Sequence, residues 1–138
     1  MAMTSQKELR LFDGQAYWFL VHGIVDVAIA IPLMVAPVAF LQLLGWGEVD
    51  MFTARVVAAA LIGIGVESLL GYRAEFHAVK ALLNVKILFG AAAIIGILWS
   101  VIAAPAVPWG AWPILALFLI FLVAWIVWRI RISGHAGK

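Results

Sequence analysis

Four long apolar stretches set the strongest limit on how this chain can fold. A helix needs about 20 mostly apolar residues to cross roughly 30 Å of hydrocarbon at about 1.5 Å per residue. The stretches that meet this requirement are 16–37, 53–72, 78–103 and 111–130. Backbone groups in lipid must be satisfied within the segment, so we expect helices and not the short alternating strands of a barrel. The sequence therefore predicts one all-α transmembrane domain over residues 1–138, a four-helix bundle of up-down-up-down topology.

Composition makes the bilayer the expected solvent and narrows the chemistry. Hydrophobic residues form 67% of the chain and charged residues 12%, whereas a soluble domain is about 25% charged. The chain has no cysteine, which excludes disulfides, thiolate metal sites, iron–sulfur clusters and thiol redox chemistry. The net charge of +2 gives no sign of a nucleic-acid partner, because the basic residues are spread along the chain. The lipid bilayer is the predicted partner.

Shorter segments connect or precede the predicted spans. The apolar segment 38–44 predicts a short helix lying in the membrane interface between the first two spans. Asp50 is placed to cap the N-terminus of the span that follows. A capping-box pattern predicts a separate surface helix over Ser5–Phe12 that ends near Gly14. We expect no cleaved signal peptide, since the first apolar run is too long and contains ionisable residues.

Basic residues indicate the orientation. One side of the predicted membrane carries Lys7, Arg10, Arg73, Lys80, Arg129, Arg131 and Lys138. The other side has only Arg55, accompanied by Glu48 and Asp50, so we expect Arg55 to snorkel or to pair with one of these carboxylates. The positive-inside rule then predicts a multi-pass protein of the cell (inner) membrane with both termini cytoplasmic. Tryptophan and tyrosine fall near both ends of the spans, which agrees with this register.

Two ionisable residues lie within the first predicted span, where each costs about 2.5–3.5 kcal/mol on insertion scales. His22 and Asp26 are four residues apart, so they share one face of a helix. Such a pair can relay protons or bind a cation, and it can equally hold two helices together by hydrogen bonds. No HxxH or HxxE motif accompanies the pair, so no metal site is predicted.

Small residues form narrow stripes on the second and third spans, and such stripes favour close helix contacts. The helix-packing positions predicted from them are Ala59, Gly63, Gly71, Ala92, Gly96 and Ser100. We expect the spans 53–72 and 78–103 to pack stripe to stripe as an antiparallel hairpin. Glu67 belongs to the first stripe, so it should face protein, either as an interhelical bridge or as a proton-coupled group.

The third span contributes two further polar groups, Asn84 and Lys86. They lie about 200° apart around a helix and cannot point at the same neighbour. Lys86 must therefore pair with another helix or an oligomer partner, or else snorkel to the cytoplasmic surface. At about 1.5 Å per residue, the polar groups of three spans fall about 8–12 Å from the cytoplasmic boundary, with Asp26 nearer the midplane.

These groups define a predicted intramembrane polar site. Its members are His22, Asp26, Glu67, Asn84 and Lys86. Because the other half of the membrane is nearly free of charge, the pattern indicates a pocket open to the cytoplasm or a buried polar knot, and not a continuous pore. No catalytic residue and no cofactor are predicted, since Ser68 and Ser100 have no histidine at helical spacing. An enzyme that acts on a lipid or quinone is therefore kept as a third hypothesis, after the two functions given below.

One segment also resembles a known group. The stretch 54–70, ARVVAAALIGIGVESLL, is similar to a helix of DoxX-like and related small bacterial four-span membrane proteins, mostly of unknown function. The resemblance covers about one helix and the four-span plan. It implies an accessory role near a membrane redox assembly, and it assigns no functional residue.

Two functions follow as hypotheses. In the first, an oligomeric membrane protein binds or moves protons or a small solute, with Asp26 and Glu67 as carriers, His22 tuning Asp26, and Asn84 and Lys86 supplying hydrogen bonds and charge. In the second, the chain is a non-catalytic accessory subunit of a larger membrane complex, and the small-residue stripes are docking faces.

Overall fold

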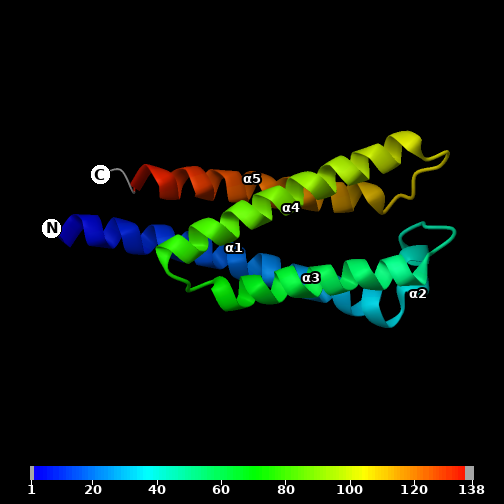
Figure 1. The fold of residues 1–138 in the computed structure, drawn as a ribbon, viewed down its shortest axis with the longest axis horizontal. Coiled ribbons are helices and arrows are strands. Elements are labelled where there is room, and N and C mark those ends of the chain that lie inside the picture. The colour runs from blue at the N-terminus through cyan, green and yellow to red at the C-terminus, as the bar shows by residue number, and fades with distance from the viewer. Residues whose placement is uncertain (1, 136–138) are drawn as a thin grey trace.

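Residues 2–135 fold into five helices joined by short connections (Figure 1). The computed structural model describes the backbone of residues 2–135 and the side chains of residues 14–75 and 77–134. The helices are α1 (Ala2–Val35), α2 (Pro37–Leu43), α3 (Met51–Gly71), α4 (Phe76–Ala103) and α5 (Ala111–His135). Four of them contain segments long and apolar enough to cross a membrane, namely Gly14–Val35, Met51–Gly71, His77–Ala103 and Ala111–Gly134. The prediction of an all-helical chain with four such helices is confirmed.

Local sequence explains where the first three helices begin and end. α1 stops at Val35 because Pro37 disfavours helical backbone at Ala36, which has φ −135° and ψ 60°. Pro37 then opens α2, where its missing N–H costs nothing. Asp50 caps α3 as predicted, since its carboxylate accepts from the backbone N–H groups of Phe52 and Thr53.

The separate surface helix expected over Ser5–Phe12 is a wrong prediction. α1 continues without interruption from Ala2 through Gly14 to Val35. Gly14 has helical backbone and does not end the helix. Its lack of a side chain instead allows α5 to approach closely. A Cβ atom added at Gly14 would lie 2.7 Å from the Trp128 ring. The capping-box side chains lie outside the described side chains.

The long helices associate as two pairs (Figure 1). α1 lies along α3, and α4 lies along α5, while α3 and α4 touch at few places. Both termini lie at one end of the molecule, and α2 lies at the other (Figure 1). At the α2 end, the Gly110 N–H donates to the Leu44 carbonyl at 2.9 Å, which ties the α2–α3 connection to the start of α5.

Two glycines explain why α3 pairs with α1. A Cβ atom at Gly23 would lie 2.7 Å from the Gly65 carbonyl oxygen, and one at Gly65 would lie 2.9 Å from the Asp26 Cβ. Glycine at both positions therefore lets the two backbones come together. The stripe-to-stripe hairpin expected between residues 53–72 and 78–103 is not formed, because the face of α3 that packs against protein is a different one.

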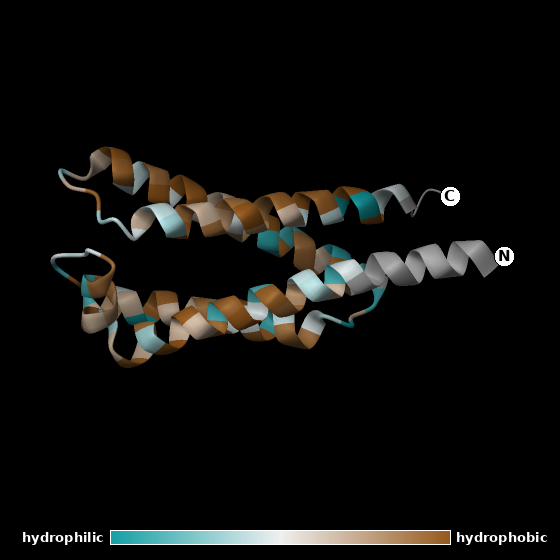
Figure 2. Cartoon of the chain, turned by 180° about the vertical axis from the view of Figure 1, so that it is seen from behind, coloured by the Kyte–Doolittle hydropathy of each residue, from teal (hydrophilic) through white to brown (hydrophobic). Residues whose placement is uncertain are grey.

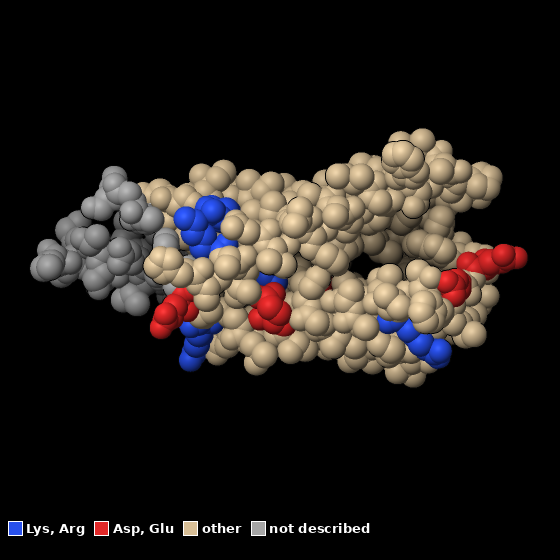
Figure 3. Space-filling view, viewed as in Figure 1, with Lys and Arg blue, Asp and Glu red and all other residues tan. Residues whose placement is uncertain are grey.

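The main core lies nearer the termini and joins α1, α4 and α5. Its buried members are Phe19, Val79, Leu83, Phe121, Trp125, Trp128 and Ile132. A smaller cluster of Leu33, Ala54 and Ala58 joins α1 to α3 nearer the α2 end. A hollow is visible between the two helix pairs on the face shown in Figure 3.

Apolar residues predominate along the described parts of the helices (Figure 2). Many large apolar side chains are exposed along all four long helices, up to 85% for Ile102. Charged side chains gather towards the two ends of the face shown in Figure 3. An apolar exterior of this extent is suited to contact with lipid.

Candidate functional site

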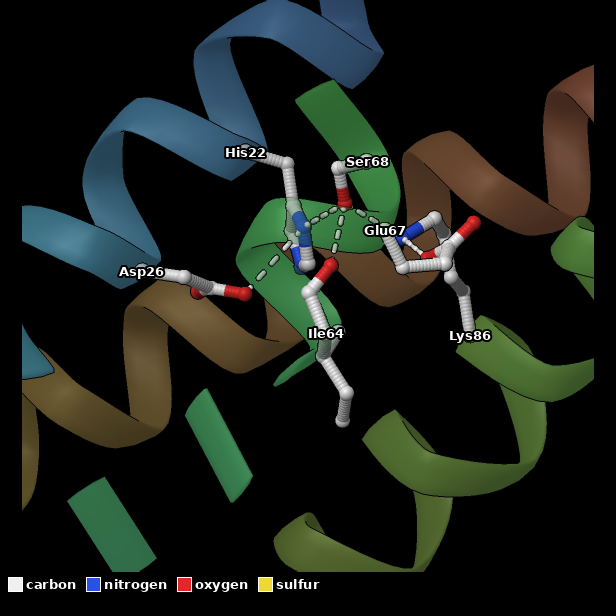
Figure 4. Close-up of polar contacts among 6 residues, drawn as sticks. All are labelled: His22, Asp26, Ile64, Glu67, Ser68 and Lys86. Atoms are coloured by element: carbon white, nitrogen blue, oxygen red, sulfur yellow. Dashed lines mark hydrogen bonds and ion pairs between the residues drawn. The ribbon is translucent and has the colours of Figure 1, made fainter. Parts of the chain in front are cut away.

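A buried lysine from α4 forms the centre of the candidate site (Figure 4). The Lys86 ammonium lies 2.7 Å from Glu67 Oε2 and 2.6 Å from Ser68 Oγ, both on α3. The Lys86 side chain is 1% exposed and that of Glu67 is 32% exposed. Of the two arrangements expected for Lys86, the structure has pairing with another helix and not snorkelling. A buried ammonium requires such partners, since an isolated charge in an apolar interior is very costly.

Ser68 connects this ion pair to α1. Its hydroxyl accepts a hydrogen bond from Lys86 and donates one to the Ile64 carbonyl oxygen at 2.8 Å. His22 Nδ1 lies 3.0 Å from the same hydroxyl oxygen. Since a serine hydroxyl has one proton, the bond to Ile64 leaves the Ser68 oxygen to accept from both Lys86 and His22. This count assigns the proton of the imidazole to Nδ1.

His22 and Asp26 form the α1 side of the site (Figure 4). His22 Nδ1 lies 3.3 Å from Asp26 Oδ2, as their spacing of four residues predicts. The two side chains are 9% and 10% exposed. The resulting series of contacts runs Asp26, His22, Ser68, Lys86, Glu67, and we call these five residues the polar cluster. It draws on three helices, and each of its links is between 2.6 and 3.3 Å long.

Aromatic side chains of α1 and α5 enclose the polar cluster. The His22 ring meets Phe121 and Trp125 edge to face, with ring centroids 4.6 and 5.1 Å apart. The Lys86 ammonium lies 5.0 Å from the centre of the Phe19 ring and 5.5 Å from that of Trp125, within cation–π range. These rings exclude water and stabilise the cation, so α5 contributes to the site although it has no ionisable group there.

Three buried polar atoms have no hydrogen-bond partner among the described residues. They are Gln15 Nε2, Asp26 Oδ2 and Glu67 Oε1. The Asp26 oxygen lies near His22 Nδ1 but outside hydrogen-bond geometry. Two of the three are carboxylate oxygens at the two ends of the polar cluster. Buried acceptors of this kind are costly unless a proton, a water or a ligand satisfies them.

Asn84 lies apart from the other predicted site residues. Its side-chain oxygen accepts from Arg129 Nε on α5 at 2.7 Å, and the residue is exposed. Asn84 and Lys86 therefore contact different helices, as the angle of about 200° between them predicts. Four of the five predicted residues come together, and Asn84 belongs to a neighbouring contact.

The small-residue positions are placed differently from the hairpin expected. A Cβ atom added at Gly63 or Gly96 would meet nothing within 4 Å. Ala59, Ala92 and Ser100 are exposed as well. Among the six, only Gly71 is buried, with Leu82 of α4 and Phe19 of α1 nearby. Whether another chain uses the exposed positions stays a prediction.

Of the two arrangements expected for Arg55, pairing with a carboxylate is not formed, and snorkelling stays a prediction. The Arg55 Nε donates to the Met34 carbonyl oxygen at the end of α1, at 3.3 Å, and the side chain forms no ion pair with Glu48 or Asp50. The Asp50 carboxylate instead serves the N-terminus of α3, and hydrogen bonds from the Thr53 hydroxyl and the Phe52 N–H lower the pKa of Asp50 below its ordinary value of 3.8.

Sequence reasoning missed Ser68 as a member of the site. Ser68 is 46 residues from His22 and 18 from Lys86, so no helical spacing relates it to either. Gln15, which is 1% exposed, is a further buried polar residue of α1 that the sequence analysis did not predict. The available signal was its position seven residues before His22, on the same face of α1.

The contacts of Ser68 resemble a catalytic arrangement in part, but the geometry does not fit one. In a serine–histidine–carboxylate triad, serine and carboxylate bond to opposite nitrogens of the imidazole. Here Ser68 and Asp26 both approach His22 Nδ1, and Lys86 is held in an ion pair. Among the described residues, no group of three or more His, Asp or Glu side chains is placed to hold a metal ion. The arrangement is suited to holding and exchanging protons or polar ligands.

Comparison with protein-family models, with curated proteins and with solved structures finds no match. The structure itself defines the class, a small all-helical protein with four helices long and apolar enough to cross a membrane.

Proposed function

We propose that this protein spans the cell (inner) membrane four times and binds protons, or a small polar solute with them, at the polar cluster. In this proposal the helices form an up-down-up-down bundle with both termini cytoplasmic. The distribution of Lys and Arg supports that orientation, because most basic residues lie towards the helix ends that are nearest the termini. The protein acts as an oligomer, and Asp26 and Glu67 are the groups that load and release protons.

The observation that carries the proposal is the pair of unsatisfied carboxylate oxygens. Asp26 Oδ2 and Glu67 Oε1 are buried and lack hydrogen-bond donors. A proton on either carboxyl, or a donor from a bound solute, would satisfy them. Because His22, Ser68 and Lys86 connect the two carboxylates through contacts of 3.3 Å or less, a change of charge at one carboxylate acts on the other.

Exposure supports access from one side. Glu67 is a third exposed, whereas His22, Asp26 and Lys86 are at most a tenth exposed. Glu67 is therefore the natural point of entry, and Asp26 is the innermost member. Towards the α2 end, the spans have no ionisable side chain beyond Asp26 except Arg55. A site reached from the cytoplasm fits this distribution better than a continuous ion pore does.

Proton flux in reconstituted vesicles tests the proposal. Purified protein is reconstituted with a pH-sensitive dye inside, and flux is followed after an imposed pH or solute gradient. We expect Asp26→Asn and Glu67→Gln to abolish the protein-dependent signal. Glu75→Gln is the matched control, because Glu75 is an exposed carboxylate just before α4 that does not contact the polar cluster. Flux that both cluster variants leave unchanged would reject the proposed role.

The second candidate is an accessory subunit of a larger membrane complex of the redox or respiratory type. The open space beside Gly63 and Gly96 favours it, because exposed small residues allow another helix to approach closely. The resemblance to DoxX-like proteins points the same way. Native mass spectrometry after gentle detergent extraction distinguishes the two, since a fixed ratio with larger membrane proteins supports the accessory role and a homo-oligomer alone does not.

A further inference from the structure

A groove opens where the end of α1 meets the start of α3, far from the polar cluster. It has a volume of about 510 Å³ and is lined by Met34, Met51, Phe52, Arg55, Val56 and Ala59. Five of these side chains are apolar, and one is a cation. The volume falls in the range of small-molecule sites, about 300–1,000 Å³. The groove thus combines apolar walls with a single positive charge.

The guanidinium of Arg55 is held in place but is not neutralised. Its Nε donates to the Met34 carbonyl oxygen at 3.3 Å, where the backbone carbonyls at the end of α1 attract a cation. Among the described residues, neither Nη atom has a hydrogen-bond partner. The nearest carboxylate in sequence, Asp50, is occupied by Phe52 and Thr53 at the start of α3. The N–H donors of both Nη atoms therefore remain free for an external anion.

The level of the groove suits the headgroup region of a bilayer. Trp46, Trp109 and Trp112 lie at the same end of the molecule, and tryptophan marks the membrane interface. Trp109 and Trp112 are more than half exposed. Figure 3 shows basic and acidic atoms at this end of the face, separated by an uncharged stretch from those nearer the termini.

We propose that this groove binds a phospholipid of the leaflet opposite the termini. The phosphate diester lies on the two free Nη groups of Arg55, which match phosphate oxygens in a bidentate geometry. An acyl chain runs along Phe52, Val56 and Ala59. The combination of one fixed guanidinium with apolar walls is complementary to a molecule that has an anionic phosphate directly above hydrocarbon.

Retention of lipid by purified protein tests this site. The protein is reconstituted in bilayers of equal parts phosphatidylethanolamine, phosphatidylglycerol and diacylglycerol, extracted into mild detergent, and analysed by native mass spectrometry. We expect one phospholipid to stay bound to the wild type through repeated detergent exchange. Arg55→Gln should lower its occupancy about tenfold, since a charge-assisted bidentate contact is lost. Ala59→Phe, which fills the groove but keeps the cation, should lower it as well.

Matched variants separate this site from general effects. Ala92→Phe adds the same bulk at an exposed position of α4, and Arg129→Gln removes a cation at the other end; both should keep the phospholipid. Retention that is equal in Arg55→Gln and wild type would overturn the proposal. Equal retention of diacylglycerol, which lacks phosphate, or displacement of the phospholipid by excess inorganic phosphate, would overturn it too. Circular dichroism on each variant verifies that the helices are formed.

Discussion

The Lys86 ammonium lies 2.7 Å from the Glu67 carboxylate, although the helices that carry them, α4 and α3, touch at few other places. The ion pair is thus a main link between the two helix pairs. The Lys86 ammonium also contacts Ser68 on α3, and it lies over the rings of Phe19 on α1 and Trp125 on α5. Near the termini these polar contacts therefore join the two pairs together with the apolar core of α1, α4 and α5.

Removing the lysine should destabilise the fold strongly. Lys86→Met leaves the Glu67 carboxylate partly buried without its partner, and breaking a buried pair costs about 3–5 kcal/mol. Because Glu67 is 32% exposed, we expect a value near the lower end, about 3 kcal/mol. The measurement is equilibrium unfolding in mixed micelles.

The control for this prediction is Lys80→Met, also on α4, which should change stability by less than about 0.5 kcal/mol. The double variant Lys86→Met/Glu67→Met should recover much of the loss, since no unpaired charge remains. Equal losses for Lys86→Met and Lys80→Met would mean that the ion pair does not hold the helix pairs together.

Close packing of α1 on α3 should make two glycines sensitive to a single methyl group. At Gly23 the added Cβ meets the Leu69 Cγ at 2.6 Å and the Gly65 backbone oxygen at 2.7 Å, so Gly23→Ala must push the helices apart. Overpacking of this kind costs about 1–3 kcal/mol. Gly65→Ala should behave alike, and unfolding of the purified variants measures both.

Gly63→Ala is the matched control, because its added methyl group meets nothing within 4 Å. There the higher helix propensity of alanine should leave stability unchanged or raise it by up to about 1 kcal/mol. If Gly63→Ala were as harmful as Gly65→Ala, the α1–α3 contact would not be the one described.

The sequence predicts the four long apolar helices and several of their ends because these depend on local signals. Apolar length gives the spans, Pro37 separates α1 from α2, and the Asp50 carboxylate finds its donors two and three residues later. Gly14 shows the limit of such signals. Glycine permits a helix end without requiring one. At Gly14 the missing side chain instead lets the Trp128 ring pack closely against α1.

The side of α3 that packs inward could not be predicted in the same way. Small residues recur on more than one face, so Ala59 and Gly63 form as good a stripe as the buried series Ala54, Ala58 and Gly65. In lipid the exterior is as apolar as the core, so hydrophobicity does not mark the buried face. Ser68 lies on that unmarked face, which is why its role emerges only from the folded chain.

Replacing Ser68 should lower the stability of the protein, because its hydroxyl has two buried partners besides its own helix. Ser68→Ala removes a partner from both Lys86 and His22 in the interior, and each unsatisfied buried group costs about 1–3 kcal/mol. We expect a loss of at least about 1 kcal/mol in unfolding experiments. Ser100→Ala on α4 is the matched control, because Ser100 is exposed and its hydroxyl donates to the Gly96 carbonyl of its own helix. Similar stabilities for the two variants would show that Ser68 does not connect the cluster.

The cap of α3 should make stability depend on pH through Asp50. Hydrogen bonds from the Thr53 hydroxyl and the Phe52 N–H lower the pKa of this carboxyl in the folded chain below its ordinary value of 3.8. The unfolded chain therefore takes up the proton first as the pH falls. The stabilisation from the cap is fully present above the unfolded pKa and is lost as the pH drops through the folded one.

Asp50→Asn isolates this effect, because asparagine still caps a helix but does not titrate. Thermal unfolding of both proteins is measured from about pH 6 down to about pH 3, where carboxyl groups of this kind titrate. The difference in unfolding temperature between wild type and Asp50→Asn should be constant at the upper end of this pH range. At the lower end the wild type should lose stability relative to Asp50→Asn. Glu48→Gln, two residues earlier and exposed, should follow the wild type. A difference that does not change with pH would mean that the Asp50 carboxylate is not a charged cap of α3.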